Sequence, residues 1–538
     1  MNLDPTLVAA RLAYRRGDFP DALSLYKLAA TGRELDLLAI LRFGSCLLTS
    51  GDVERAIDQL EAGLKLAPGD FGLLIHLACA KEIQGQEAEA AKLYRTIIAR
   101  SPNASVAFVN LGYLMLTRGN TAGAVDCLQR GLDAPPAYVE TNLILPTFKV
   151  EVLPAPKVGS PDPALSMALV MLGLKLQESG RFEEARTCFL QATLQNGRNG
   201  SAYGALALAS KITKEQSPLV DRMLELSKAR DIDIPNRTRL YFALGKAMDD
   251  LGEYKTAISY FEEGHRLGRE QSAAPFDRVA FETEVDSIIR ASDYVDDEGE
   301  LLRGSDSDLP ILIVGMMRSG TTLVEQILSS HPEVAAGEEL AFWRDHGFRQ
   351  LRVGLGPPTK QEATELALAY TTLLREIDPD SQRVTDKMPH NFMAIGLANR
   401  VFPNSRIVCC RRHPIDICLS IYMTDFRHPI PFVNTRGDLV FFYQQFERLM
   451  DHWHKVIPAD RLIDVRYEDL LNDREAITRR LVDFCGLEWD DACLRPEDNR
   501  RAVKTASVWQ VRQKVYSTSL ERWRRYEPWL GEFQSLLS

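Results

Sequence analysis

A glycine that returns every 34 residues dominates the N-terminal part of the chain. Four glycines carry the pattern: Gly17, Gly51, Gly85 and Gly119. Alanine follows each of them five residues later, a large apolar or aromatic residue follows nine residues later, and a small residue precedes each by seven. Glycine permits a tight turn and small residues let two helices approach closely, so this period predicts stacked pairs of helices. The N-terminal part is therefore expected to be all-helical.

The period and its small and large positions resemble the tetratricopeptide repeat, a helix–turn–helix unit. The pattern returns around Gly180 and Gly252, and a degenerate unit is expected near residues 201–237. The resemblance implies an array over residues 1–290 that winds into a superhelix with a concave groove. A proline-rich loop insertion at about 139–164 interrupts it. The groove suggests capture of a protein or peptide; a rigid spacer or an oligomerisation surface is the alternative, because a fold alone does not give a function.

Residues 309–328 combine a short apolar run, a Gly/Ser loop and an apolar-periodic helix. This arrangement directs backbone N–H groups and a helix N-terminus at an anion, usually a phosphate. The spacing nearly matches the nucleotide-binding pattern G-x-x-x-x-G-K-[ST], but Thr321 stands in place of the lysine and Arg318 lies inside the loop. Without the lysine that reaches the β- and γ-phosphates, the loop suits a single 5′-phosphate better than a triphosphate.

Short apolar runs alternate with helical patterns through the rest of the chain, which predicts a parallel sheet with helices on its faces. The predicted strands are Ile311–Gly315, Arg383–Asp386, Arg406–Arg411 and Leu462–Arg466. Ligands of such sheets bind outside the carboxyl ends of the strands. Polar residues follow each predicted strand at that end: Arg318, Lys387, Arg412 and Tyr467.

The run Arg318-Ser-Gly-Thr-Thr-Leu323, with His331-Pro-Glu-Val and Gly337-Glu-Glu339 after it, resembles the sulfotransferases that use 3′-phosphoadenosine 5′-phosphosulfate (PAPS). It is most similar to the tyrosylprotein sulfotransferase branch, over about residues 309–525. The chain is therefore expected to be multidomain: the all-α tetratricopeptide superhelix, a linker at 291–308 that is acidic and rich in Gly and Ser, and an α/β, P-loop-like, parallel-sheet sulfotransferase domain over 309–538. It further implies sulfonate transfer to an acceptor hydroxyl, with protein tyrosine as the acceptor and the repeats recruiting it. A glycan, lipid or small-molecule acceptor is the alternative.

The resemblance also implies which residues bind the donor. The anion loop consists of Arg318, Ser319, Gly320, Thr321 and Thr322. An arginine at the end of a strand and a serine eight residues later hold the 3′-phosphate in the family, and these are Arg412 and Ser420 here. Tyr467, Ser507 and Arg522 match family positions near the nucleotide, whereas Thr424 replaces a second basic residue of the family.

Sulfonate transfer needs a base for the acceptor hydroxyl and cations for the charge on the sulfonate and the leaving phosphate. The resemblance places the base at Glu339, with Arg318 on the sulfonate, Lys387 at the bridging oxygen and Ser507 as a further hydrogen-bond donor. The scheme needs no metal. The pair His452 and His454 is not expected to bind one, since residues two apart on a helix point to different faces.

Charge and composition exclude several other classes. A net charge of −10 argues against a general nucleic-acid binder. The chain has no apolar run of membrane-spanning length and no signal-peptide pattern at its start, and its nine cysteines are expected to be buried thiols, so a cytoplasmic location is expected. A P-loop kinase or NTPase and a non-catalytic repeat scaffold are the rival functions, and homodimer formation is left open.

Overall fold

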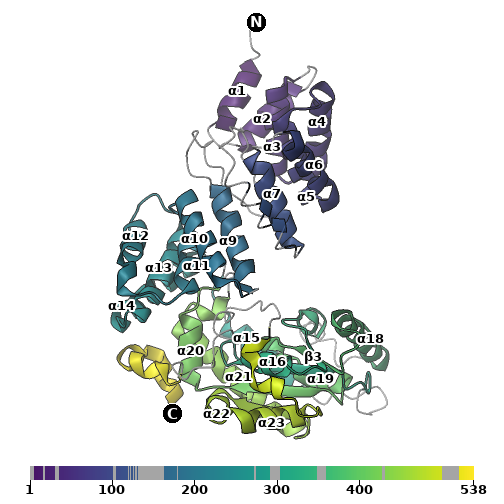
Figure 1. Ribbon diagram of the computed structural model, residues 1–538, viewed down its shortest axis with the longest axis vertical. Coiled ribbons are helices and arrows are strands. Elements are labelled where there is room, and N and C mark those ends of the chain that lie inside the picture. The colour runs from purple at the N-terminus through teal and green to yellow at the C-terminus, as the bar shows by residue number, and fades with distance from the viewer. Residues whose placement is uncertain are drawn as a thin grey trace. The chain divides into compact units, whose positions relative to one another are not determined.

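The computed structural model describes residues 5–15, 19–30, 35–100, 104–118, 120, 123–124, 126–127, 130, 163–178, 180–271, 274–290, 303–347, 359–426, 430–499 and 520–537. The chain forms two compact units (Figure 1). The first consists of Met1–Leu176 with Arg181–Leu206, and the second of Gln177–Gly180 with Ala207–Ser538. The predicted insertion at 139–164 and linker at 291–308 fall largely outside the described residues.

The N-terminal part is built from helices, and the first six of them pack in consecutive pairs. These are α1 (Pro5–Arg15), α2 (Phe19–Ala30), α3 (Leu37–Thr49), α4 (Val53–Leu66), α5 (Phe71–Ile83), α6 (Glu87–Arg100), α7 (Ser105–Thr117), α9 (Pro163–Glu178), α10 (Phe182–Gln195) and α11 (Gly200–Ala209). Gly51 and Gly85 form turns with φ of +83° and +80°, as the period predicts. A methyl group on Gly44 would lie 2.8 Å from Cδ2 of Leu60, so the small positions do allow close helix contact.

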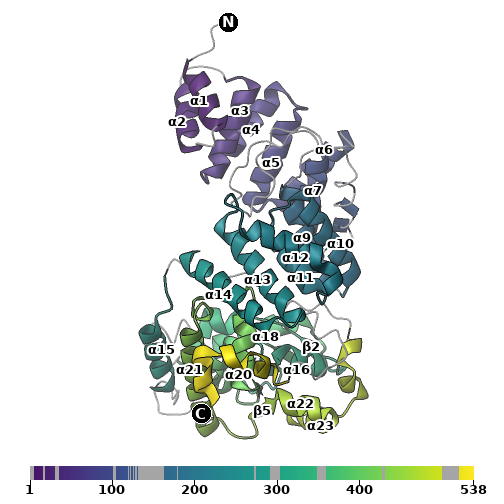
Figure 2. The same ribbon diagram turned by 90° about the vertical axis from the view of Figure 1, so that its left-hand side faces the viewer.

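Further helices precede the sheet of the second unit (Figure 2). They are α12 (Ser217–Ser227), α13 (Ile234–Asp250), α14 (Tyr254–Gln271) and α15 (Arg278–Arg290). The pair α13–α14 repeats the expected pattern: Gly252 makes the turn with φ of +83°, and Ala257 and Phe261 are buried. Helices α11 and α12 occupy the stretch near 201–237, and a degenerate unit there stays a prediction.

The sheet of the second unit has five parallel strands in the order β2-β3-β1-β4-β5. They are β1 (Pro310–Gly315), β2 (Val334–Ala336), β3 (Arg383–Asp386), β4 (Arg406–Arg411) and β5 (Leu462–Arg466). Four of these are the predicted strands. The fifth strand, β2, lies at the edge of the sheet. It has only three residues, which is too few for a period-two pattern to show in the sequence.

Helices cover both faces of this sheet. They are α16 (Thr321–Leu328), α18 (Lys360–Ile377), α19 (Ile395–Val401), α20 (Pro414–Tyr422), α21 (Arg436–Val456), α22 (Tyr467–Asn472) and α23 (Arg474–Phe484), with η8 (Arg522–Trp529) and η9 (Gly531–Leu537) at the C-terminal end. Alternate residues of β1 enter two different cores: Leu312 and Val314 pack with α19–α21, and Ile311 and Ile313 pack with α16 and α23. Strands buried on both faces in this way are the reason for their continuous apolar sequences.

None of the helices in the described residues is long and apolar enough to cross a membrane.

Candidate active site

The anion loop runs from the end of β1 to the start of α16, and its backbone depends on two glycines. Gly315 has φ of +144°, and a Cβ there would lie 2.6 Å from the carbonyl oxygen of Cys410. Gly320 has φ of +107° and is the N-cap of α16, so no side-chain oxygen of the N-cap residue competes for the first N–H groups of the helix. Ser319, Thr321 and Thr322 are buried around these N–H groups. The loop thus has the geometry of a helix N-terminal anion site.

Arg412, at the end of the neighbouring strand β4, lies against this loop. Its Nη1 donates to the carbonyl oxygen of Arg318 over 3.3 Å, and its guanidinium stacks over the ring of Tyr467 at 4.8 Å. Its Nη2 is 3.9 Å from Oδ2 of Asp416, and only 9% of the Arg412 side chain is exposed. The guanidinium is therefore held in one place by a ring, a carboxylate and the loop backbone.

Ser420 on α20 connects the predicted 3′-phosphate pair, Arg412 and Ser420, to the anion loop. Nε of Arg318 donates a hydrogen bond to its Oγ over 3.1 Å, although the two residues are 102 positions apart. The hydroxyl of Thr424 donates to the carbonyl oxygen of Ser420 over 2.7 Å and so satisfies a backbone acceptor in the last turn of α20. Thr424, which stands where the family has a basic residue, thus makes a local contact with α20.

Glu339 and Lys387 meet beside the carboxyl end of β3. Nζ of Lys387 is 2.5 Å from Oε1 of Glu339; the lysine side chain is 1% exposed and the glutamate side chain is 43% exposed. The backbone N–H of Lys387 also donates to the carbonyl oxygen of Glu338 over 2.8 Å. The expected base and the expected cation for the leaving group are thus in direct contact.

Two buried carboxylates that sequence reasoning missed support this segment. Oε1 of Glu325 accepts hydrogen bonds from the backbone N–H of Glu338 and from the Thr385 hydroxyl, each over 3.1 Å. Oδ2 of Asp386 accepts a hydrogen bond from the Tyr370 hydroxyl over 2.7 Å. Burial, opposed by the Tyr370 hydrogen bond and assisted by the nearby charge of Glu325, raises the pKa of Asp386 to about 7. A carboxylate in an apolar helix face, as at Glu325, was the available signal.

The structure gives Arg522 a partner outside this cluster. Arg522 pairs with Asp249 on α13, with 2.5 Å between Nη2 and Oδ2, so its role at the nucleotide stays a prediction. Ser507 lies outside the described residues, and its role also stays a prediction.

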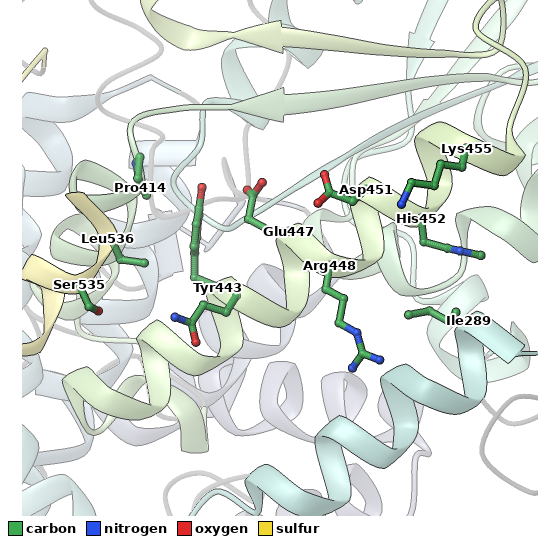
Figure 3. Close-up of a pocket in the computed structure, with 11 residues that line it drawn as sticks. Ile289, Pro414, Tyr443, Glu447, Arg448, Asp451, His452, Lys455, Ser535 and Leu536 are labelled. Carbon is green, nitrogen blue, oxygen red and sulfur yellow. The ribbon is translucent and has the colours of Figure 1, made fainter. Parts of the chain in front are cut away.

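A hollow of about 760 Å³ lies elsewhere, along α21 and η9 (Figure 3). None of the predicted site residues lines it. Arg448 is directed toward the helix that carries Ile289, and its Nη2 lies 2.5 Å from Asp286 on that helix, whereas Glu447 is directed to the other side. His452 lines the same hollow, while His454 pairs with Asp464, and no metal-binding group of three or more residues occurs in the described part of the chain.

Comparison with known proteins supports two kinds of module. A family model described as "Sulfotransferase family" matches residues 310–491. Models described as "Tetratricopeptide repeat" match residues 7–71, 77–139 and 238–264. These matches confirm the resemblances inferred from the motifs: tetratricopeptide repeats precede a sulfotransferase domain.

Similar proteins are distant in sequence. An uncharacterized protein of Aquifex aeolicus (strain VF5) is 26% identical over 528 residues, which is 91% of this chain and 68% of that protein. Protein-tyrosine sulfotransferase 2 of Gallus gallus is 24% identical over 36% of this chain and 55% of its own length. Heparan sulfate glucosamine 3-O-sulfotransferase 6 of Homo sapiens is 25% identical over 33% of this chain and 52% of its own length. The chain thus spans about half the length of these animal relatives.

Two solved structures are similar to parts of the chain. The sulfotransferase domain from the Synechococcus PCC 7002 olefin synthase has 21% sequence identity and a TM-score of 0.33, over 43% of this chain and 98% of that one. A tetratricopeptide repeat protein from Parabacteroides merdae has 15% identity and a TM-score of 0.31, over 49% of this chain and 92% of that one.

Proposed function

We propose that the sulfotransferase domain of this repeat protein transfers a sulfonate group from PAPS to an acceptor hydroxyl. The observation that carries the proposal is the contact between the two anion-binding motifs. Arg318 of the loop donates to Ser420, and Arg412 donates to the backbone of Arg318. Two phosphate sites side by side, without a loop lysine for a triphosphate, suit a nucleotide with separate 5′- and 3′-phosphates.

Donor binding uses the residues of both motifs. The N–H groups of the loop and of the first turn of α16 bind the 5′-phosphate, and the helix N-terminus favours its negative charge. Arg412 and Ser420 bind the 3′-phosphate, and a planar guanidinium can make two parallel hydrogen bonds to it. The ring of Tyr467 stacks against the guanidinium of Arg412 and holds it in place.

Transfer itself is assigned to the Glu339–Lys387 pair and Arg318. Glu339 takes the proton of the acceptor hydroxyl, whose oxygen attacks the sulfur as the bond from sulfur to the bridging oxygen breaks. Lys387 neutralises the charge that develops on that oxygen, and Arg318 stabilises the sulfonate in transit. The products are a sulfate ester and 3′,5′-adenosine bisphosphate, and no metal takes part.

Protein tyrosine is the proposed acceptor, and the repeats are proposed to recruit it. The similarity to protein-tyrosine sulfotransferase 2 of Gallus gallus supports this choice. The similarity to a heparan sulfate glucosamine 3-O-sulfotransferase favours a glycan as the second candidate. The cytoplasmic location and a homodimer stay predictions.

Calorimetric titration with 3′,5′-adenosine bisphosphate, beside ATP with Mg²⁺, tests the donor. The expected result is metal-independent binding of the bisphosphate that Arg412→Ala weakens at least about 100-fold. Arg479→Ala is the matched control, because Arg479 forms an exposed pair with Glu475 on α23. Mg²⁺-dependent ATP binding without bisphosphate binding would instead indicate a kinase, and binding of neither would indicate a scaffold.

The acceptor is tested with labelled PAPS and two substrates, a tyrosine-containing acidic peptide and heparan sulfate. Label on the peptide supports protein tyrosine, whereas label on the polysaccharide alone contradicts it. If the repeats recruit the acceptor, the KM for a protein acceptor should rise with little change in kcat when the repeats of the first compact unit are removed and α13–α14 are kept, since remote binding that is equal in ground and transition states acts on KM.

A further inference from the structure

Asp249, near the end of α13, holds the C-terminal segment of the chain by two hydrogen bonds. Its Oδ2 lies 2.5 Å from Nη2 of Arg522, and its Oδ1 accepts from the Tyr526 hydroxyl over 2.5 Å. The Asp249 side chain is 14% exposed. The ring of Tyr254, at the start of α14, contacts the ring of Tyr526 edge-on at 5.2 Å. The last helical pair therefore fixes η8 by a carboxylate and a ring.

The segment fixed by Asp249 in turn contacts the start of α20. The backbone N–H of Trp523, the neighbour of Arg522, donates to Oδ1 of Asp416 over 2.9 Å. The Trp523 ring stacks on His413 with 5.2 Å between centroids. Both partners lie within four residues of Arg412 in the sequence.

Asp416 completes the connection to the donor site. Its other oxygen, Oδ2, is 3.9 Å from Nη2 of Arg412, and its side chain is 2% exposed. A carboxylate buried to this degree is costly unless its hydrogen bonds and opposite charge are present, so its position depends on Trp523 as well as on Arg412. A continuous series of polar contacts thus runs from Asp249 through Arg522–Trp523 and Asp416 to Arg412.

The same helical pair also contacts the other end of α20. Nε2 of His265 on α14 donates to the carbonyl oxygen of Tyr422 over 2.7 Å, and the two rings stack at 4.0 Å. Burial lowers the pKa of His265 to about 4, so this imidazole is neutral near pH 7. Because Ser420 lies two residues before Tyr422, the helix that carries the second phosphate motif is fixed at both ends through contacts with α13–α14.

We propose that Asp249 is a positioning residue for the donor site, and that the pair α13–α14 is a structural part of that site as well as the last repeat. The inference rests on the proposed function, because it concerns the affinity for the same nucleotide. Loss of the Asp249 carboxylate should release η8, so that Asp416 no longer holds Arg412 at the 3′-phosphate.

The test is Asp249→Asn in the full chain, with 3′,5′-adenosine bisphosphate affinity and the donor KM as readouts. We expect the Kd and the donor KM to rise about 10-fold while the acceptor KM stays within about two-fold, since only the donor pocket is disturbed. Asp249→Glu should recover most of the affinity. Tyr526→Phe, which removes one hydroxyl and keeps the ring, should raise the Kd about three-fold and serves if Asp249→Asn does not fold.

Asp286→Asn is the matched control, because Asp286 makes an aspartate–arginine pair of the same length between α15 and Arg448 of α21. It should leave the donor Kd unchanged. If the wild type binds the bisphosphate and Asp249→Asn binds it with the same Kd, the inference is overturned and the proposed function still stands. An equal loss in Asp286→Asn would overturn it as well, since the effect would then be general destabilisation. Absence of bisphosphate binding in the wild type would overturn both.

Discussion

Nζ of Lys387 lies 2.5 Å from Oε1 of Glu339, and the two side chains differ widely in exposure, at 1% and 43%. The ammonium is buried and depends on this partner for charge compensation, whereas the carboxylate retains contact with water. The expected base and the expected electrophilic group thus neutralise each other before substrates arrive. An acceptor hydroxyl and the bridging oxygen of the donor would have to take over these contacts when they bind.

Substitutions of this pair should therefore have unequal effects on stability. Glu339→Gln leaves a buried ammonium without its counter-charge and should lower the free energy of unfolding by about 2 kcal/mol, less than the roughly 3–5 kcal/mol of a fully buried pair. Lys387→Met removes the buried charge and leaves a solvated carboxylate, so stability should be unchanged or higher. Both should lower kcat at least about 100-fold, with bisphosphate affinity retained in Glu339→Gln.

Tryptophan fluorescence during urea unfolding is the measurement, because all six tryptophans lie between residues 343 and 529 and report the sheet-containing unit. Glu475→Gln on the surface of α23 is the control and should change stability by less than about 0.5 kcal/mol. Equal destabilisation by Glu339→Gln and Lys387→Met would contradict the asymmetry.

Gly320→Ala should damage donor binding through the backbone. At φ of +107° an alanine is strained, and its Cβ would lie 2.8 Å from Cδ2 of Tyr467, the ring beneath Arg412. Strain of this kind costs about 1–3 kcal/mol, and displacement of the ring should raise the bisphosphate Kd at least about 10-fold. Gly204→Ala is the control: it lies within α11 with no atom within 4 Å of the added Cβ, so it should stabilise its helix by about 0.5–1 kcal/mol. Calorimetry and thermal unfolding check both outcomes.

Glu325→Met should slow transfer without weakening donor binding. The carboxylate of Glu325 accepts from the backbone N–H of Glu338 and from Thr385, so its loss leaves a buried donor unsatisfied next to the base. We expect kcat to fall about 10-fold or more, with the bisphosphate Kd within about two-fold. Glu325→Gln keeps an acceptor oxygen and should restore most of kcat. A rise in Kd with normal kcat would place Glu325 in donor binding instead.

The sequence predicted those elements that depend on a pattern of neighbouring residues. Apolar runs marked four strands, glycines that require positive φ marked the anion loop, and the 34-residue period marked the repeats. Contacts between distant segments left no such signal. Lys387 and Glu339 are 48 residues apart, and Asp249 and Arg522 are 273 apart, so their pairing depends on strand order and helix packing. The support at Asp386 was missed for the same reason, whereas Glu325 had a local signal, a carboxylate within an apolar helix, that was not used.

Asp386 should give the sheet-containing unit a characteristic pH dependence. Burial raises the pKa of its carboxyl to about 7 in the folded protein, against 3.8 for an ordinary aspartate. Between about pH 4 and pH 7 the folded state keeps a proton that the unfolded state has released, so this group lowers stability as the pH rises through that window. Asp386→Asn removes the titration and keeps an acceptor for Tyr370. Its stability relative to the wild type should therefore increase from pH 5 to pH 8.

Urea midpoints from tryptophan fluorescence at pH 5, 6, 7 and 8, for both proteins, measure the difference directly. Tyr370→Phe offers an independent check, since the Tyr370 hydrogen bond lowers the pKa of Asp386 and its loss should move the window to higher pH. A difference between Asp386→Asn and wild type that is constant over this range, or that shrinks toward pH 8, would show that Asp386 is already ionised in the folded protein at pH 5. Asp386 would then support the Lys387 segment as a buried anion, and not as a carboxyl group that is protonated below about pH 7.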